Sequence, residues 1–237
     1  MPEILTMATS HDTRPSASLT AVVEHCARQK IDATCELDVV APCVRVKRKL
    51  STKPSVAVIV PTRGTSAEVF GHERVLVVEA VRSLFEKSTY QNFEVVIVAD
   101  TPTPQSVLDT LREIGGARLK VINFDRPFNF AEKNNLGAMS CASDLILLLN
   151  DDTEMISPDA LETLVGLLQD PKVAMAGPML LYEDGLIQSA GHLLNPVPYD
   201  LYRHQSTDCV GAQYLLRAQR EVSGVIAACA LIKRSVF

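Results

Sequence analysis

The residues that could do chemistry in this chain stand directly after runs of apolar residues. The clearest case is Asn150, Asp151 and Asp152, which follow the apolar run at 145–149. Adjacent carboxylates at the end of a buried strand are electrostatically costly unless a cation or hydrogen-bond donors balance them. Carboxylate oxygens suit Mg²⁺ or Mn²⁺, which take one or two protein carboxylates and complete their coordination with phosphate and water. An acidic turn before a helix has the same pattern, so the spacing alone leaves both interpretations open.

Three further sets of polar residues follow apolar runs in the same way. Arg63 and Gly64 come after the first run, where a guanidinium offers forked donors to phosphate or a base and a glycine permits close approach. Asp100 comes after the second run and could accept hydrogen bonds from a ribose or a base edge. Lys133 lies where a crossover helix begins, within reach of a diphosphate held there. Turn formation and local backbone hydrogen bonding also explain each set when it is taken alone.

The elements that must position these residues alternate between buried strands and amphipathic helices. Continuous apolar runs predict strands at 55–60, 94–99, 118–123, 144–149 and 173–176. Helical spacing of apolar residues predicts helices at 73–87, after Thr103, at 131–140 and after Ser157, with Thr103 and Ser157 as caps. Strands that alternate with helices form a mainly parallel sheet, which binds ligands at the carboxyl ends of its strands. The polar residues above fall at those ends.

Three regions are expected along the chain. Residues 1–15 are polar and predict a disordered tail. Residues 16–52 predict a small α+β appendage with a helix at 16–30 and two short extended pieces broken by Pro42. The basic stretch 45–49 within it is interpreted as a solvated edge strand or linker, with a patch for an anionic partner as the alternative. Residues 53–237 form the main domain, in which short β segments replace the alternation beyond Gly177.

The composition narrows the class of protein. The chain has 237 residues and a formal net charge of −5, and its 47% hydrophobic and 22% charged residues are ordinary for a globular domain. Because nucleic-acid binders normally carry a basic surface, no nucleic-acid partner is expected. The longest purely apolar run, 225–232, is too short to span a bilayer, and residues 1–14 lack the features of a secretory signal. Six cysteines without a C-x-x-C pair indicate reduced thiols, so a cytoplasmic protein is expected.

The segments together resemble, in order and spacing, the family 2 glycosyltransferases, in particular bacterial glycan and rhamnosyl-type transferases. The resemblance covers residues 55–237 and rests on VAVIVPTRG, FEVVIVAD, FDRPFNFAEKNNLGAMS, LILLLNDDTEMISPDALETLV, GLIQSAGH and REVSGVIAACALIKRSVF. It implies the α/β GT-A fold, a Rossmann-like and mainly parallel sheet with helices on both faces. The stretch before residue 53 is similar to the segment that precedes such domains in larger bacterial glycan-assembly transferases.

The resemblance also implies roles for particular residues. It predicts a nucleotide-sugar site made of Pro61, Thr62, Arg63, Asp100, Lys133, Asn135 and Asp151. Within this site Asp100 would contact the base or ribose, and Asp151 would face the donor sugar or ribose. Asp152 would hold Mg²⁺ or Mn²⁺ on the diphosphate, with Asn150 in the place of the first Asp of the family's D-x-D motif.

The implied function is transfer of a sugar from a nucleotide-diphosphate sugar to a hydroxyl of a growing glycan or other acceptor. Metal assistance and inversion are the family's expectation. The implied partners are the sugar nucleotide and a glycan or lipid-linked glycan, with peripheral membrane association through other parts of a longer protein. Ser189, in place of a His, and Ile226-Ala227, in place of Thr-Gly, depart from the family on the acceptor side and leave the acceptor unassigned.

The family pattern also raises an expectation about the end of the chain. Relatives continue beyond the position of Phe237 into a glycine-rich turn and an acidic pair that supplies the general base. We therefore expect the general base beyond Phe237, little or no turnover by these 237 residues, and an exposed apolar sheet edge at 222–232. Two alternatives stay open: a catalytically silent nucleotide-sugar-binding or scaffold module, and a nucleotidyltransferase, which needs a glycine- and lysine-rich loop in place of residues 61–65.

Overall fold

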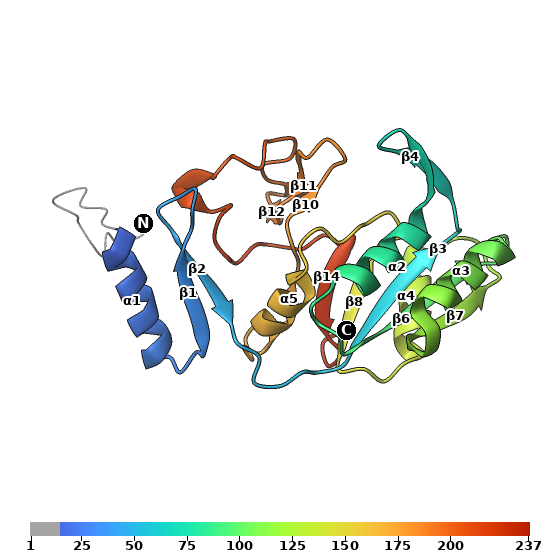
Figure 1. Ribbon diagram of the computed structural model, residues 1–237, viewed down its shortest axis with the longest axis horizontal. Helices are drawn as coiled ribbons and strands as arrows, with labels where there is room; N and C mark the ends of the chain where they lie inside the picture. Colours follow the sequence, from blue (N-terminus) through green and yellow to red (C-terminus); the bar gives the residue numbers. More distant parts are fainter. Residues whose placement is uncertain (1–14) are drawn as a thin grey trace. The chain divides into compact units, whose positions relative to one another are not determined.

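The computed structural model describes residues 15–237, which divide into two compact units (Figure 1). One unit consists of the described residues up to Lys49 together with Asp208–Glu221. The other consists of Leu50–Thr207 and Val222–Phe237. The predicted tail falls on residues 1–14, which lie outside the described residues, and on Pro15, which begins the first helix.

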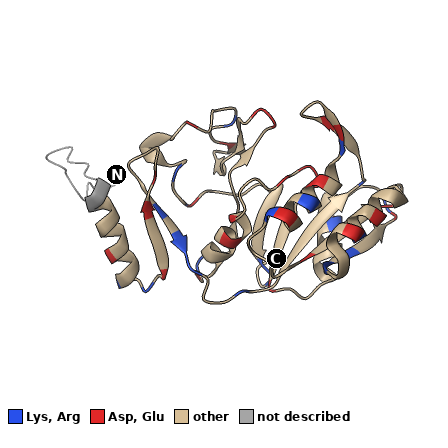
Figure 2. Ribbon diagram, viewed as in Figure 1, with Lys and Arg blue, Asp and Glu red and all other residues tan. Residues whose placement is uncertain are grey.

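The smaller unit is a helix beside a β-hairpin. Helix α1 (Pro15–Arg28) precedes strands β1 (Ala33–Leu37) and β2 (Val44–Arg48), which pair antiparallel, and a 3₁₀ turn at Ala212–Tyr214 belongs to the same unit. Arg45 of β2 pairs in register with Glu36, the one acidic residue of β1 (Figure 2), and Lys49 forms an ion pair with Asp32 just before β1. The basic stretch 45–49 is therefore largely a hairpin strand with acidic neighbours.

Asp38 holds this unit together. Its side chain is fully buried and accepts hydrogen bonds from the backbone N–H of Val40 at 2.8 Å and of Ala41 at 3.0 Å. Arg217 places Nη2 3.0 Å from Oδ2 of Asp38, and Arg45 forms a second ion pair. The hydrogen bond from Arg217, the backbone donors and the charge of Arg45 outweigh burial and hold the pKa of Asp38 well below its ordinary value.

The larger unit is built on a six-stranded sheet. Its strand order is β7 (Leu119–Phe124), β6 (Phe93–Asp100), β3 (Val56–Thr62), β8 (Leu145–Leu149), β14 (Cys229–Lys233) and β9 (Met175–Ala176). The first four strands are parallel, and β14 runs antiparallel to both of its neighbours. Strands β3, β6 and β8 are apolar runs of the sequence, because a strand covered on both faces buries nearly all of its side chains. The edge strand β7 is less buried and leaves Lys120 exposed.

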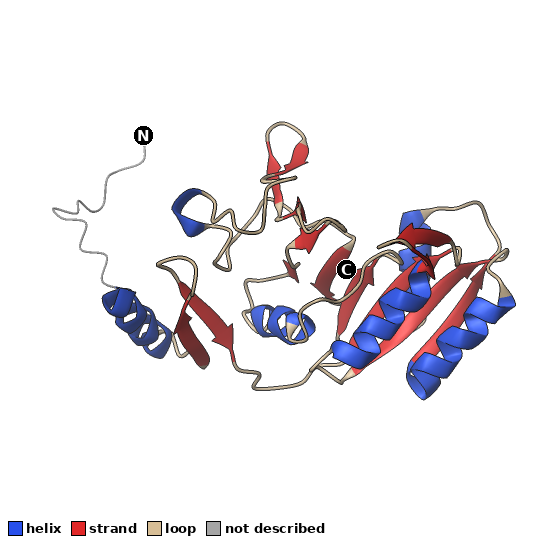
Figure 3. Ribbon diagram, turned by 45° about the horizontal axis from the view of Figure 1, so that its top comes forward, coloured by secondary structure: helices blue, strands red, loops and turns tan. Residues whose placement is uncertain are grey.

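Helices cover both faces of this sheet. Helices α2 (Leu76–Lys87), α3 (Gln105–Gly115) and α5 (Ala160–Leu168) pack on one face, and Figure 3 shows α2 and α3 side by side across the strands. Helix α4 (Phe130–Met139) packs on the other face. A 3₁₀ turn at Gly116–Arg118 follows α3. The predicted α/β class with helices on both faces of a mainly parallel sheet is confirmed.

Three short hairpins complete the unit, and one of them was not predicted. Strands β10 (Leu180–Leu181) and β11 (Ile187–Ser189), like β12 (His192–Leu194) and β13 (Pro198–Asp200), are the expected β segments beyond Gly177. Strands β4 (Ser66–Val69) and β5 (His72–Val75) are the unexpected pair, so α2 begins at Leu76 and not at residue 73. Phe70 and Gly71 both have positive φ, the backbone of a two-residue hairpin loop.

Two smaller expectations were also wrong. Helices α3 and α5 have Pro104 and Asp159 at their N-caps without a side-chain hydrogen bond, so Thr103 and Ser157 are not the caps. Thr103 is buried in the turn after β6, and its hydroxyl oxygen has no hydrogen-bond partner among the described residues. The expected exposed sheet edge at 222–232 is wrong for β14, which lies between β8 and β9 with Ala230 and Leu231 at most 1% exposed. Val222, at the start of the segment, is 36% exposed. Over the described residues, the model contains no helix with the length and apolar content needed to cross a bilayer.

Replacing Gly137 with alanine is expected to destabilise the larger unit. A Cβ at this position of α4 would come within 2.4 Å of Ile59 Cγ2 and 3.2 Å of Val98 Cγ2. Alanine favours a helix over glycine by about 1 kcal/mol, but overpacking of a buried contact costs about 1–3 kcal/mol. We therefore expect a net loss of unfolding free energy in urea titrations. Met139→Ala, on the same helix at an 85% exposed position, is the control and should change stability by less than about 0.5 kcal/mol. A more stable Gly137→Ala protein would contradict the close approach of α4 to the sheet.

Replacing Asp38 with asparagine is expected to loosen the smaller unit in a pH-dependent way. Removing one partner of a buried ion pair costs about 3 kcal/mol or more. Because the pKa of Asp38 is lowered by folding, its contribution is present in full above its ordinary value of 3.8 and is lost as the pH falls below that value. Urea unfolding followed through the amide signals of β1 and β2 should show a large difference between parent and variant at neutral pH. The difference should shrink between about pH 5 and about pH 2; a difference that is constant with pH would exclude the ionised carboxylate as its source.

Candidate functional site

The carboxyl ends of the parallel strands meet where the chain changes direction across the sheet. From β3 the chain proceeds outward to β6 and β7, and it then returns to the opposite side of β3 to form β8. The topological switch point therefore lies between β3 and β8. In open α/β sheets this point leaves a crevice in which ligands bind.

The last residues of β3 lie at this switch point without partners in β8, because the ladder to β8 stops early. We call this region beside the strand ends the crevice. Strand β3 pairs with β6 along its whole length but with β8 only from Val56 to Ile59. Pro61, which lacks an N–H, is tolerated inside the sheet because only one neighbour is paired there. The strand continues through Thr62, two residues beyond the predicted end. Thr62 Oγ1 donates a hydrogen bond to Asp151 Oδ2 at 2.6 Å, so a side-chain contact replaces the missing ladder.

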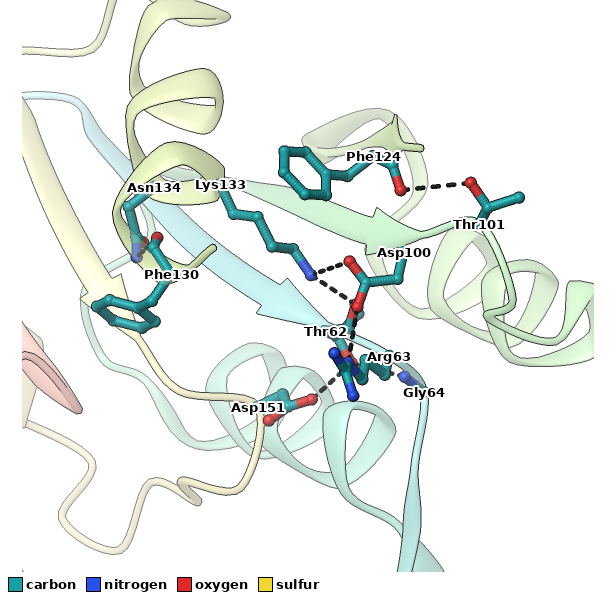
Figure 4. A network of polar contacts seen from close by, with 10 residues as sticks. All are labelled: Thr62, Arg63, Gly64, Asp100, Thr101, Phe124, Phe130, Lys133, Asn134 and Asp151. Atoms are coloured by element: carbon teal, nitrogen blue, oxygen red, sulfur yellow. Dashed lines mark hydrogen bonds and ion pairs between the residues drawn. The ribbon is translucent and has the colours of Figure 1, made fainter. Parts of the chain in front are cut away.

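Asp100, at the end of β6, is a buried carboxylate with two cationic partners. Its side chain is 8% exposed. Lys133 Nζ lies 2.8 Å from Oδ1, and Arg63 Nε lies 2.9 Å from Oδ2. Lys133 Nζ also donates to the carbonyl oxygen of Thr62 at 2.9 Å, as Figure 4 shows. Both oxygens of Asp100 are thus paired, and these contacts offset the desolvation cost of burying the carboxylate.

Lys133 and its neighbours on α4 serve different purposes. The side chain of Lys133 is fully buried, with its ammonium over the rings of Phe124 and Phe128 at 5.7 and 5.4 Å. Asn134 is buried and donates to the carbonyl of Phe130 at 2.9 Å, a local backbone role. Asn135 is exposed.

Phe128 is a residue that the sequence reasoning missed. The guanidinium of Arg63 lies 4.9 Å from the centre of its ring, and the residue is 51% exposed. Arg63 itself is 56% exposed, so the pair presents a cation and an aromatic ring to the outside of the crevice. The aromatic-rich loop that follows the third parallel strand was the signal available in the sequence.

The acidic residues after β8 are less well compensated than Asp100. Burial raises the pKa of Asp151; the hydrogen bond from Thr62 lowers it, the charge of Asp152 raises it, and the charge of Lys133 lowers it. Asp152 is exposed. Within residues 15–237 no group of three or more His, Cys, Asp or Glu side chains is arranged to hold a metal ion by itself. Asp151 and Asp152 therefore offer a partial set of oxygen ligands.

The structure brings most of the predicted site together. Thr62, Arg63, Asp100, Lys133 and Asp151 are joined by the hydrogen bonds above, and we call these five residues the strand-end network. Pro61 is buried in β3 beside it. Asn135 and Asp152 are exposed and are not members of it. On the predicted acceptor side Ser189 is 1% exposed, so its side chain faces the interior.

Known proteins are similar to this chain along most of its length. The family model described as "Glycosyl transferase family 2" matches residues 58–237. The chain is 34% identical over 188 residues to "Uncharacterized protein y4gI" of Sinorhizobium fredii, covering 78% of this chain and 20% of that protein. It is 34% identical over 181 residues to "O-antigen biosynthesis protein RfbC" of Myxococcus xanthus, covering 76% and 13%. The chain thus spans a fifth or less of the length of these relatives.

Solved structures of glycosyltransferases are also similar. The mannosyltransferase PcManGT from Pyrobaculum calidifontis, in complex with GDP-Man and Mn²⁺, shares 17% identity at a TM-score of 0.47, covering 72% of this chain and 47% of that one. TarS 1–349 from S. aureus shares 21% identity at a TM-score of 0.41, covering 51% and 34%. Because the family model covers most of its residues, the chain belongs to glycosyl transferase family 2, with the α/β GT-A fold.

Proposed function

We propose that this chain binds a nucleotide-diphosphate sugar at the carboxyl ends of β3, β6 and β8 and transfers the sugar to a hydroxyl of a glycan or lipid-linked glycan. The observation that carries the proposal is the strand-end network, which gathers donors and acceptors at the switch point of the sheet. The name of one relative, an O-antigen biosynthesis protein, supports a glycan acceptor.

The nucleoside half of the donor would lie at the ends of β3 and β6. Arg63 keeps exposed N–H groups that can donate to the nucleotide while its Nε holds Asp100. Asp100 would contact the base or ribose, and the exposed ring of Phe128 offers a face for stacking. Pro61 and Thr62 would line the same site.

The diphosphate and the sugar would lie toward the end of β8. Mg²⁺ and Mn²⁺ favour oxygen ligands, and Mg²⁺ commonly takes one or two carboxylates together with substrate phosphates, which fits the exposed Asp152 beside Asp151. Asp152 would hold the ion, Asp151 would face the sugar or ribose, and Asn135 would approach the donor from α4. Such an ion, when bound, supplies neutralisation of the charge that develops on the leaving diphosphate.

Transfer then requires that the acceptor hydroxyl meets the anomeric carbon opposite the diphosphate. A bond forms between the acceptor oxygen and that carbon as the bond to the diphosphate breaks, and the electron pair leaves with the diphosphate. The hydroxyl proton goes to a general base, whose help is worth about 10²–10⁴-fold in rate. An in-line displacement of this kind inverts the anomeric centre. We name no residue of this chain as the general base.

A binding panel tests the proposal. Nucleoside diphosphates of each common base, and their sugar nucleotides, should be titrated by calorimetry with and without Mn²⁺. We expect one base to be preferred and Mn²⁺ to strengthen binding of the diphosphate. Asp100→Asn and Arg63→Ala should each weaken binding about tenfold, which is about 1.4 kcal/mol, because their proposed partner is the base or ribose. Arg112→Ala, an exposed arginine on α3, is the control.

The panel separates the proposal from its alternatives. Absence of any nucleotide binding by the parent would contradict it. Tight binding of a sugar nucleotide without acceptor-dependent release of the nucleoside diphosphate would instead support the catalytically silent module. Release of pyrophosphate from a nucleoside triphosphate and a sugar phosphate would support a nucleotidyltransferase.

Asp152→Asn is expected to remove the effect of the metal and leave the fold intact. Its side chain is exposed, so the substitution disturbs no packing. The asparagine amide lacks the negative charge that favours a divalent cation, so Mn²⁺ should no longer strengthen diphosphate binding. Binding of the nucleoside without metal should be unchanged. Asp109→Asn, an exposed aspartate on α3, is the matched control. If Asp152→Asn kept the full Mn²⁺ effect, Asp152 would not be the metal ligand.

A further inference from the structure

Lys133 presents a fully buried positive charge at the candidate site. Its side chain is 0% exposed, and Nζ lies 2.8 Å from Asp100 Oδ1 and 2.9 Å from the carbonyl oxygen of Thr62. Burial of an ammonium group is unfavourable unless such partners replace its hydration. Two rings, those of Phe124 and Phe128, lie against the same ammonium. The protein's own groups therefore occupy the surroundings of Nζ.

The two oxygens that Lys133 contacts belong to two neighbouring strands. Thr62 ends β3 and Asp100 ends β6, while Lys133 comes from α4 on one face of the sheet. A single side chain thus ties the two strand ends to the helix. Figure 4 shows the ammonium between these two residues.

Each residue that Lys133 holds carries a second contact toward the crevice. The other carboxylate oxygen of Asp100 accepts from Arg63, which is 56% exposed. The hydroxyl of Thr62 donates to Asp151, which is half-buried. Lys133 is therefore one contact removed from both residues that face the crevice.

We infer that Lys133 is a positioning residue: it fixes Asp100 and the end of β3 so that Arg63 and Asp151 are presented to the donor, and it does not bind the diphosphate itself. This inference rests on the proposed function, because it takes the crevice as the donor site. It differs from the role that the family resemblance implied, in which Lys133 belongs to the nucleotide-sugar site. Loss of Lys133 would leave the Asp100 carboxylate buried with Arg63 as its remaining cation, and the carboxylate would turn away from its present position.

The test compares a nucleoside with its diphosphate. Lys133→Met removes the ammonium group and keeps an unbranched side chain that is one atom shorter. Positioning through Asp100 predicts that this variant binds both the preferred nucleoside and its diphosphate at least tenfold more weakly, by the same factor. A lysine that touches the diphosphate predicts loss for the diphosphate alone, and that result would overturn the inference. Lys120→Met, an exposed lysine on β7, is the control and should bind as the parent does.

A double variant keeps the test decisive if Lys133→Met does not fold. Removal of both members of a buried ion pair is tolerated better than removal of one. In an Asp100→Asn background the inference predicts that Lys133→Met adds less than about threefold to the loss for either ligand, because the two residues act as a unit. A further tenfold loss confined to the diphosphate would identify Lys133 as a direct ligand.

A measurement without nucleotide separates this inference from the proposed function. The Arg63 Nε–H, donated to Asp100, should give a slowly exchanging NMR signal in the parent. The Lys133→Met variant tests whether Lys133 controls that hydrogen bond. If this variant does not fold, the double variant is compared with Asp100→Asn instead. A shifted and faster-exchanging Arg63 signal in Lys133→Met supports the positioning role of Lys133, and an unchanged signal contradicts it. In the Asp100→Asn background the Arg63 signal should be the same with and without Lys133. A parent that binds no nucleotide would end the proposed function, while this signal would still decide the role of Lys133.

Discussion

Burial of a carboxylate is unfavourable unless cations or hydrogen-bond donors balance its charge, and the arrangement of the strand ends follows from that constraint at Asp100. The cation comes from α4, whose Lys133 must reach the sheet along a path that excludes water. Gly137 lies one turn further along and on the same side of the helix, because residues four apart share a face. Its missing Cβ lets α4 approach Ile59 and Val98. The ion pair and the glycine therefore both depend on α4 packing closely against the end of the sheet.

The geometry of the sheet supplies the other half of the site. Strand β8 pairs with β3 only as far as Ile59, so the last residues of β3 have a free side toward the crevice. The hydroxyl of Thr62 occupies that side and reaches Asp151. A longer ladder would have placed backbone groups there and left no room for a ligand. Early termination of one ladder thus leaves the end of β3 free of backbone partners on its β8 side, where the proposed donor would lie.

The sequence predicted the parts of this site that depend on strand ends, and it missed the parts that depend on packing. Apolar runs located β3, β6 and β8, and parallel pairing then brings Thr62, Asp100 and Asp151 to one edge. Burial of Lys133 could not be inferred, because lysine is usually exposed and its partner is 33 residues away. The contact between Asp38 and Arg217 spans 179 residues, and no local pattern records it. The β4–β5 hairpin was missed because its loop needs a positive φ at Phe70, which is uncommon for such a residue.

The charges of the site divide it into two halves with different chemistry. At the end of β6 the single carboxylate of Asp100 faces two cations, Lys133 and Arg63, so this half carries no uncompensated negative charge. At the end of β8 Asp151 has a hydroxyl as its hydrogen-bond partner, burial raises its pKa, and Asp152 adds a second negative charge. A cation gains most where negative charge is least compensated. A ligand with one end held by hydrogen bonds and an anionic end that needs a cation fits this division, and the nucleotide-diphosphate sugar proposed above has that form.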